Sequence, residues 1–229
     1  TNTLYYSMLG VGNFVTGKAT VVQEILIENP STLPGGEVSF VEGKAHTGTR
    51  SMKYNSATTI GHVFPQGKIG LIADKKYVFS AWVSRDNVAK IDFEGVELDV
   101  EELVGASWVP ISDPTTLTKG KVVEGWQKIE FEFSTASTNP VIGISLRSSV
   151  SGSPAEVYLD DVRISPKTGG IVTYVYDAHN YRLKAMLDAN NYATLYFYDE
   201  EGNLHLTKRE TERGIQTISE NRGHSKESN

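Results

Sequence analysis

Residues 158–164 read YLDDVRI, a short strand-like run that contains two adjacent aspartates. Upstream of this run lies about one domain's worth of similar strand-like sequence. Downstream, from about Thr168, the chain changes to a short repeat. We therefore interpret YLDDVRI as the closing strand of a β domain that a repetitive segment follows.

The composition agrees with a folded β protein. The chain has 229 residues, of which 39 % are hydrophobic and 22 % are charged, so it can bury a sizeable core. Its 21 glycines and 8 prolines fall between short apolar runs, which favours many turns and an all-β fold. No apolar run approaches the roughly 18 residues of a membrane span.

Charge and cysteine content exclude several classes of function. The formal net charge of −6 and the pI near 5.4 argue against nucleic acid as a partner, because phosphate binding needs clustered Lys and Arg. The chain has no cysteine, which excludes a disulfide framework, a thiolate nucleophile and cysteine-bound metal. It does not begin with Met, so we expect it to be part of a longer protein.

Period-two alternation predicts which side chains enter the core. In residues 77–84, Phe79 shares one strand face with Ala81 and Val83, whereas Trp82 lies on the other face. Residues 128–134 alternate so that Ile129, Phe131 and Phe133 point inward. About eight such strands are expected, and the others include residues 20–28, 37–42, 51–54, 141–146 and 157–164. The pattern predicts a two-sheet sandwich over residues 1–166.

A family resemblance follows from five landmarks in their order: GNF at 12–14, AHTGTRS at 45–51, YVFSAWV at 77–83, GWQKIEFEF at 125–133 and VYLDDVRI at 157–164. Their order and spacing resemble those of jelly-roll carbohydrate-binding modules, over roughly residues 9–166. The resemblance implies a structural Ca²⁺ between the first loop and the last strand, with Asp160 and Asp161 as its carboxylate ligands. The alternative is that one aspartate caps a turn and the other is solvated.

The same resemblance implies a glycan ligand, and glycan binding needs exposed aromatic rings with polar neighbours. Trp82 and Trp108 are the main candidates for such platforms, and Tyr54 is a further one. Arg85 is a polar companion close to Trp82 in the sequence. For each ring the alternative is burial in or beside the core.

The segment 167–220 carries an eleven-residue repeat, because Asp177, Asp188 and Asp199 recur at equal spacing. Three residues after each aspartate stands Asn180, Asn191 or Gly202, which are residue types that tolerate positive φ. The repeat predicts a β-meander with a tight turn at each aspartate. Two interpretations remain open: the strands continue a larger shell, or they pack on the sandwich as a ribbon.

The repeat also resembles a known family. Tyr198, Asp199, Gly202 and Leu204 match the pattern Y-D-x-x-G-x-L of the YD repeats in Rhs and teneurin-like surface proteins and toxins. The resemblance implies a secreted or cell-surface bacterial protein. Residues 221–229 are polar and are expected to form a disordered tail.

One enzymatic alternative deserves a test. ELDVEE, residues 97–102, matches the E-x-D-x-x-E pattern of laminarinase-like glycoside hydrolases, in which Glu97 would be the nucleophile, Asp99 its helper and Glu102 the acid/base. Strict alternation places Glu97 and Asp99 on one face, and Glu102 joins them only if the strand has a bulge. The alternative is an amphipathic strand with an acidic outer face.

The sequence thus predicts an all-β chain, a jelly-roll-like sandwich followed by a short YD-repeat meander. The function it favours is non-catalytic binding or display, with a glycan as ligand. The alternatives are a structural assembly or spacer module, whose partners are other domains of the same polypeptide, and the glycoside hydrolase.

Overall fold

The computed structural model describes residues 38–56, 61–62, 67–68, 71–85, 96–138, 140–148, 155–177 and 179–221. Every regular element within these ranges is a β-strand, which confirms the all-β prediction. The expected strand at 20–28, the GNF loop and most of the predicted tail lie outside the described residues. No helix in the described part is long and apolar enough to cross a membrane.

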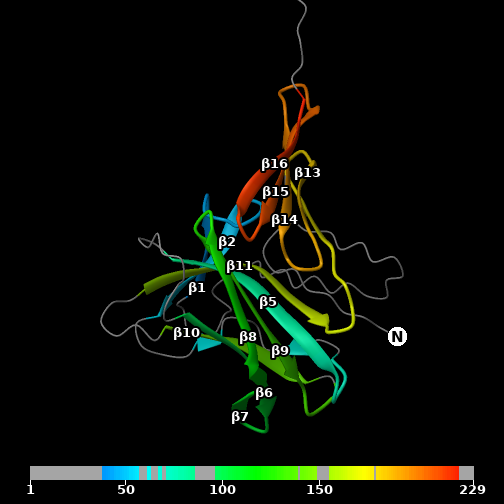
Figure 1. Cartoon of the computed structure of the whole chain (residues 1–229). Coiled ribbons are helices and arrows are strands. Elements are labelled where there is room, and N and C mark those ends of the chain that lie inside the picture. Colours follow the sequence, from blue (N-terminus) through cyan, green and yellow to red (C-terminus); the bar gives the residue numbers. More distant parts are fainter. Residues whose placement is uncertain are drawn as a thin grey trace, which may run out of the picture.

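Two antiparallel sheets form the sandwich (Figure 1). The larger sheet has six strands in the spatial order β1 (Val38–Glu42), β2 (Arg50–Ser56), β11 (Ala155–Pro166), β5 (Lys76–Arg85), β9 (Trp126–Ser134) and β8 (Ser112–Val123). The smaller sheet has the order β3 (Gly61–His62), β10 (Val141–Ser148), β6 (Val96–Val104) and β7 (Ser107–Pro110), and β4 (Gly67–Lys68) also pairs with β10.

The core lies between the two sheets, as the alternation predicts. Phe79 of β5 and Phe131 of β9 are cross-strand neighbours whose rings stack at a centroid distance of 4.8 Å. Both are almost fully buried, and Val100 and Ile144 of the smaller sheet belong to the same apolar cluster. Burial of each such side chain contributes about 1.5–3 kcal/mol to folding, so this cluster supplies much of the driving force for stacking the sheets.

The aspartate pair of YLDDVRI sits in a β-bulge. The register between β11 and β5 shifts between Asp160 and Arg163, and Asp161 has a φ of 45°. The extra residue lets both aspartates leave the core while Leu159 and Val162 on either side of them remain in it. The bulge therefore aims two carboxylates at the outer side of the larger sheet.

The C-terminal repeat forms a third sheet, a five-stranded meander, as predicted. Its strands are β12 (Thr173–Tyr176), β13 (Leu183–Leu187), β14 (Ala193–Tyr198), β15 (Leu204–Thr211) and β16 (Gly214–Glu220), and each pairs with the next. In Figure 1 this sheet, coloured yellow to red, meets the larger sheet at one end and projects away from it at the other. The chain passes from β11 to the meander through the exposed residues 167–170.

Each aspartate of the repeat starts a turn in which its carboxylate accepts backbone hydrogen bonds. Asp188 Oδ1 accepts from the backbone N of Asn190 at 2.9 Å and of Tyr192 at 3.1 Å. The predicted positive φ is confirmed at Asn191 (64°) and at Gly202 (91°).

The prediction for the first turn is wrong in its position, because Tyr181 rather than Asn180 takes positive φ (56°). That turn is one residue longer: the N–H of Asp177 reaches the carbonyl of Arg182, five residues on, whereas Asp188 reaches only Tyr192, four residues on. The added residue moves the left-handed position along by one.

Candidate functional site

The outer face of the larger sheet carries Trp82 in the middle of β5, and only 1 % of that residue is exposed. Its ring stacks on the His46 ring at a centroid distance of 4.0 Å, and Tyr192 meets it edge-on. Its indole N–H donates to the carbonyl of Asn191 at 2.7 Å. The expectation of an exposed platform at Trp82 is therefore corrected: the meander covers this face of the sheet.

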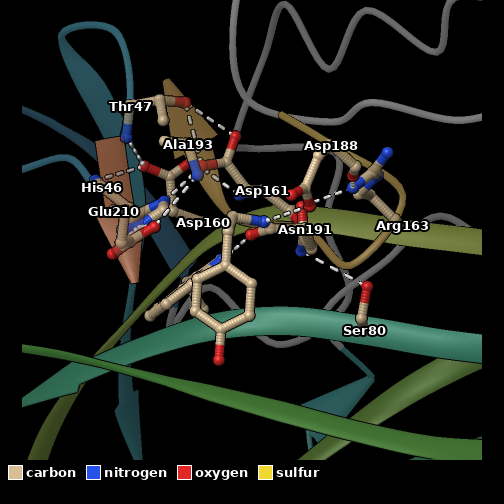
Figure 2. A network of polar contacts seen from close by, with 12 residues as sticks. His46, Thr47, Ser80, Asp160, Asp161, Arg163, Asp188, Asn191, Ala193 and Glu210 are labelled. Carbon is tan, nitrogen blue, oxygen red and sulfur yellow. Dashed lines mark hydrogen bonds and ion pairs between the residues drawn. The ribbon is translucent and has the colours of Figure 1, made fainter. Parts of the chain in front are cut away.

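His46 stands at the centre of the covered region, between two carboxylates (Figure 2). Its Nδ1 lies 2.7 Å from Asp161 Oδ2 and its Nε2 lies 3.0 Å from Glu210 Oε1, and these side chains are at most 5 % exposed. Burial alone lowers the pKa of His46, but the hydrogen bonds and charges of Asp161 and Glu210 outweigh it and raise the pKa to about 10. His46 is thus a buried imidazolium that joins the sandwich to β15 of the meander.

The two aspartates are held by donors from the loop around His46. Asp160 Oδ2 accepts from the backbone N of His46 at 2.7 Å, and its Oδ1 accepts from the backbone N of Asp161 at 2.8 Å. Asp161 also accepts from the hydroxyl of Thr47 at 2.8 Å. Burial and the adjacent charge of Asp161 raise the pKa of Asp160, against the opposing effect of His46. Both aspartates are buried, so the alternative of a solvated aspartate is wrong.

These surroundings do not fit a calcium site formed by the described residues. Ca²⁺ needs about 6–8 oxygen ligands, whereas Asp160 and Asp161 face N–H and O–H donors and the imidazolium of His46. In the described ranges no group of three or more His, Asp or Glu side chains is arranged so that it could hold a metal ion. The first loop, where further ligands were expected, lies outside those ranges, so calcium stays a prediction.

The Asp188 turn of the meander packs against the outer face of the larger sheet (Figure 2). Asn191, only 1 % exposed, donates from Nδ2 to the carbonyl of Asp161 at 3.0 Å and accepts at Oδ1 from Arg163 at 2.9 Å. Arg163 also donates to the carbonyls of Asp188 and Ile171. Side chains of the sandwich thus hold the turn mainly by its backbone.

A cavity of about 90 Å³ remains between the sandwich and the meander. It is lined by Ala45, His46, Glu124, Trp126, Ala193, Leu195, Glu210 and Ile215. Sites for small organic ligands usually span about 300–1,000 Å³, so this cavity is too small for a sugar chain. The junction therefore has the properties of a structural contact.

The outer face of the smaller sheet carries a different polar group. Asp99 of β6 and Ser145 of β10 are direct cross-strand partners, and they alternate with core residues such as Val100 and Ile144. Ser145 has no exposed surface, and neither its Oγ nor Asp99 Oδ1 has a hydrogen-bond partner. Buried polar atoms nearly always have partners, so this pair calls for a water molecule or a ligand.

Three other side chains in the described part also have such an atom, namely Ser51, Arg163 and Thr173. In the strand ladders Ser51 pairs with Val41, Arg163 with Ser80 and Thr173 with Leu187. Within the described residues, only Asp99 and Ser145 face each other across a strand pair. That makes the outer face of the smaller sheet the stronger candidate for ligand binding.

Trp108, a predicted platform, belongs to the same face. It pairs with Leu103 in the ladder of β6 and β7, so alternation places it on the side of Glu101 and Asp99. Trp108 is half-buried, and Glu101 is 3 % exposed. Of the other two predicted ligand residues, Arg85 is half-buried at the end of β5, and the side chain of Tyr54 lies outside the described part. The structure thus separates Trp108 from Trp82, one on each sheet.

The glycoside hydrolase pattern fails on geometry. The pairing of β6 with β10 runs without a register shift from Val96 to Glu102, so the bulge that this pattern requires is absent from this ladder. Glu102 therefore lies on the opposite strand face from Asp99 and from the position of Glu97. Its carboxylate accepts from the backbone N of Ala136 at 3.0 Å and from the hydroxyl of Ser137. Glu102 thereby caps the turn after β9.

Sequence reasoning missed His46, Glu210 and the Asp99–Ser145 pair. His46 was noticed only as part of the AHTGTRS landmark, and Glu210 lies 164 residues from it. Their positions in the sequence therefore do not predict that they are in contact. The signal for Ser145 was its polar side chain within the apolar run VIGISL.

No protein-family model matches the sequence, and no curated protein matches it. Among solved structures, one similar chain is the Clostridium thermocellum endo-1,4-beta-D-xylanase 10B, comprising CBM22-1 and GH10 modules complexed with xylohexaose. The identity is 21 %, the TM-score is 0.41, and the match covers 57 % of this chain and only 24 % of the xylanase chain.

Two other similar structures are single carbohydrate-binding modules. The CBM22-1 xylan-binding domain from Paenibacillus barcinonensis has 17 % identity and a TM-score of 0.40, over 60 % of this chain and 86 % of that one. The family 30 carbohydrate-binding module of a Clostridium thermocellum cellulosomal cellulase has 10 % identity and a TM-score of 0.37, over 71 % and 94 %. At these scores the similarity carries no functional argument, and the fold class rests on the strands themselves.

Proposed function

We propose that this chain is a non-catalytic, glycan-binding module in which the outer face of the smaller sheet meets the ligand. The observation that supports it is the half-buried ring of Trp108 on the same sheet face as Asp99, a half-buried residue whose Oδ1 has no hydrogen-bond partner. Sugars offer both complements: hydroxyls for the oxygen and an apolar ring face for the indole.

The meander has a separate, structural role in this proposal. It covers the outer face of the larger sheet through Trp82, His46 and Asn191, which holds the sandwich in one orientation relative to the repeat. The ligand-binding face then lies on the sheet that the meander does not pair with. Such an arrangement suits a module displayed on a longer YD-repeat polypeptide at the cell surface or in the secreted fraction.

Non-catalytic binding is favoured over hydrolysis by the position of Glu102. Retaining hydrolysis needs two carboxyl groups about 5–5.5 Å apart on the two sides of one sugar bond. The pattern assigns these two roles to Glu97 and Glu102, whose positions in the unshifted ladder fall on opposite faces of the strand, so they cannot flank a common bond. Glu102 is also engaged in capping a turn, which gives it a structural reason to be there.

Affinity electrophoresis tests the proposal. Native gels containing xylan, mixed-linkage β-glucan, galactomannan or starch are compared with gels lacking polysaccharide, for the wild type and Trp108→Ala. We expect at least one neutral polymer to retard the wild type and to retard Trp108→Ala less. Phe197→Ala, which removes an aromatic ring that is 39 % exposed on the meander, is the matched control and should behave as wild type. Retardation that Trp108→Ala fully retains would remove Trp108 from the site.

A second candidate function is a structural assembly or spacer module. The buried junction favours it, because outward polar groups of the larger sheet, among its described residues, form their hydrogen bonds with the meander. In this case the partners are other domains of the same polypeptide. No retardation of the wild type by any polymer in the gels, or on a glycan array, would favour this candidate over glycan binding.

A further inference from the structure

We infer that the outer face of the larger sheet is a docking site for one kind of repeat turn, an Asp-x-x-Asn turn whose asparagine takes the left-handed position. The partner that this site fits is a β-meander that presents such a turn. Docking there does not depend on the covalent link through residues 167–170, and it is separate from glycan binding by the smaller sheet.

Three side chains of the sandwich bind the backbone of the Asp188 turn (Figure 2). The carbonyls of the first, third and fourth residues of turn 188–191 accept hydrogen bonds from Arg163, Lys128 and Trp82, each at 2.7 Å. The donors come from β11, β9 and β5, which are neighbours in the larger sheet. Two of them are cationic side chains, and hydrogen bonds from such groups are stronger than those between neutral groups. Three adjacent strands thus form one site that fits the backbone of a turn.

Backbone carbonyls are common to all turns, so the selectivity of the site must come from a side chain. Asn191 supplies it, because its Nδ2 donates to the carbonyl of Asp161 at 3.0 Å and to Ser80 Oγ at 3.3 Å. Its Oδ1 accepts from Arg163 at 2.9 Å. Asn191 has a φ of 64°. Glycine also adopts this conformation readily, but it has no amide group to make these bonds.

The other two aspartate turns of the repeat lack this arrangement. The Asp199 turn has Gly202 in the left-handed position, with a φ of 91° and no side chain. The Asp177 turn has the same Asp-x-x-Asn-Tyr sequence as residues 188–192, but there Tyr181 takes positive φ and is 74 % exposed. Because turns of a meander alternate between its two ends, both of these lie at the other end. The site therefore distinguishes turns by backbone shape as well as by sequence.

Charged and aromatic groups around the turn complete the site. Tyr192 meets the Trp82 ring edge-on at a centroid distance of 5.7 Å, and Lys128 Nζ lies 5.1 Å from the ring centroid of Tyr192. Beside them the imidazolium of His46 on the sandwich pairs with Glu210 of the meander. These contacts do not involve the exposed link between β11 and β12, so they can hold the two parts together after that link is cut.

The test is to cut the link in the folded, full-length chain. A recognition sequence for a site-specific protease is inserted between Gly169 and Gly170, which are both exposed. A short flexible link holds its two ends at an effective concentration in the millimolar range, so docking that relied on the link would be lost at about 1 μM after cleavage. We expect the two fragments of the cleaved wild type to co-elute as a 1:1 complex in size-exclusion chromatography at about 1 μM.

Asn191→Gly separates recognition of the turn from the conformation of the turn. Glycine keeps the left-handed backbone at little cost, but it removes three side-chain hydrogen bonds, one of them to a cation. We expect the dissociation constant of the cleaved fragments to rise about a hundredfold or more. The chain has no cysteine, so one cysteine added after Asn229 can carry a fluorophore, whose anisotropy on serial dilution gives this constant. Asn180→Gly, in the exposed Asp177 turn, is the matched control and should bind as wild type.

Lys128→Met tests the site from the side of the sandwich. It removes the donor to the carbonyl of Asn190 and keeps most of the aliphatic chain, so it should raise the dissociation constant about tenfold. Lys76→Met is its matched control, because the Lys76 side chain lies on the same sheet and is 63 % exposed. That variant should bind as wild type.

The outcomes decide as follows. Separation of the cleaved wild-type fragments at about 1 μM overturns the inference. A cleaved Asn191→Gly complex as tight as wild type also overturns it, because another surface would then hold the meander. If uncleaved Asn191→Gly lacks the wild-type circular dichroism spectrum, Lys128→Met decides instead, and a dissociation constant equal to that of Lys76→Met would overturn the inference. Retardation in polysaccharide gels concerns only the smaller sheet, so the two proposals fail separately.

Discussion

Replacing His46 with Ala removes the only positive group that lies between Asp161 and Glu210 in the described part of the junction. Both carboxylates have side chains that are 3 % exposed, and each contacts one nitrogen of the His46 ring. In the variant they would remain buried without that cation. The substitution also leaves a gap beside the Trp82 ring, against which the imidazole stacks.

The size of the effect follows from the loss of a buried ion pair. Removing one partner of such a pair costs about 3–5 kcal/mol of folding free energy, most of it from the charge that is left behind. For a chain of this length, each kcal/mol corresponds to a change of about 2–4 °C in melting temperature. We therefore expect His46→Ala to lower the melting temperature by about 6–20 °C at neutral pH.

Thermal unfolding followed by circular dichroism measures this shift. His179→Ala is the matched control, because the His179 side chain is 97 % exposed in the first meander turn, and its loss should cost less than about 0.5 kcal/mol. The double variant His46→Ala/Glu210→Gln should lose less stability than the two single changes added together, since it no longer carries both unpaired charges. A melting temperature for His46→Ala within about 2 °C of wild type would refute the reasoning.

Three further predictions concern the same region. The pKa of His46 is raised from 6.5 to about 10 in the folded protein. The stabilisation from protonated His46 is therefore complete below about pH 6.5 and is lost as the pH rises through 10. The difference in melting temperature between wild type and His46→Gln should narrow over that range, and a constant difference would contradict the charged state of His46. Asn191→Ala should lower the free energy of unfolding, measured by chemical denaturation, by about 2–4 kcal/mol, because it strains a positive φ and leaves buried hydrogen-bonding groups without partners. Asn180→Ala, in an exposed turn, should lower it by less than about 1 kcal/mol. Equal losses would show that Asn191 does not anchor the meander. EDTA should leave the melting temperature unchanged, since N–H and O–H donors and His46 already surround the aspartates; a clear fall would instead establish a calcium site that other residues complete.

The core of the sandwich could be predicted because its strands alternate cleanly. Phe79, Phe131 and Phe133 occupy every second position of their strands, and all three are buried as expected. β8 was not predicted, and its sequence shows why: Pro114 and Gly120 interrupt it, and its pairing with β9 shifts register twice. An edge strand tolerates such breaks, because only one side of it needs backbone hydrogen bonds.

The turns of the meander could be predicted where the residue type decides the backbone. Asn191 and Gly202 adopt positive φ at low cost, and both follow their aspartate by three residues. In the first turn the Asp-to-Asn spacing was the same, but the ladder partner of Tyr176 is Leu183 and the pairing there contains an irregularity. Strand register, which the local sequence did not reveal, therefore determined that Tyr181 takes the left-handed position.

The burial of Trp82 shows what alternation cannot decide. Alternation identifies the residues that leave the core, and it placed Trp82 correctly on the outer face of β5. Whether another sheet covers that face depends on Asn191, which lies 109 residues further along the chain. The residues that indicate a covered face are polar. Arg163 and Asn191 are both buried, and each would be costly to bury without the other. On β11, Asp160, Asp161 and Arg163 all point outward, next to the outward Trp82 of β5. Such a group of charged side chains around one aromatic ring predicts a covered sheet face more strongly than an exposed one, because an exposed face would leave these side chains solvated and without need of each other.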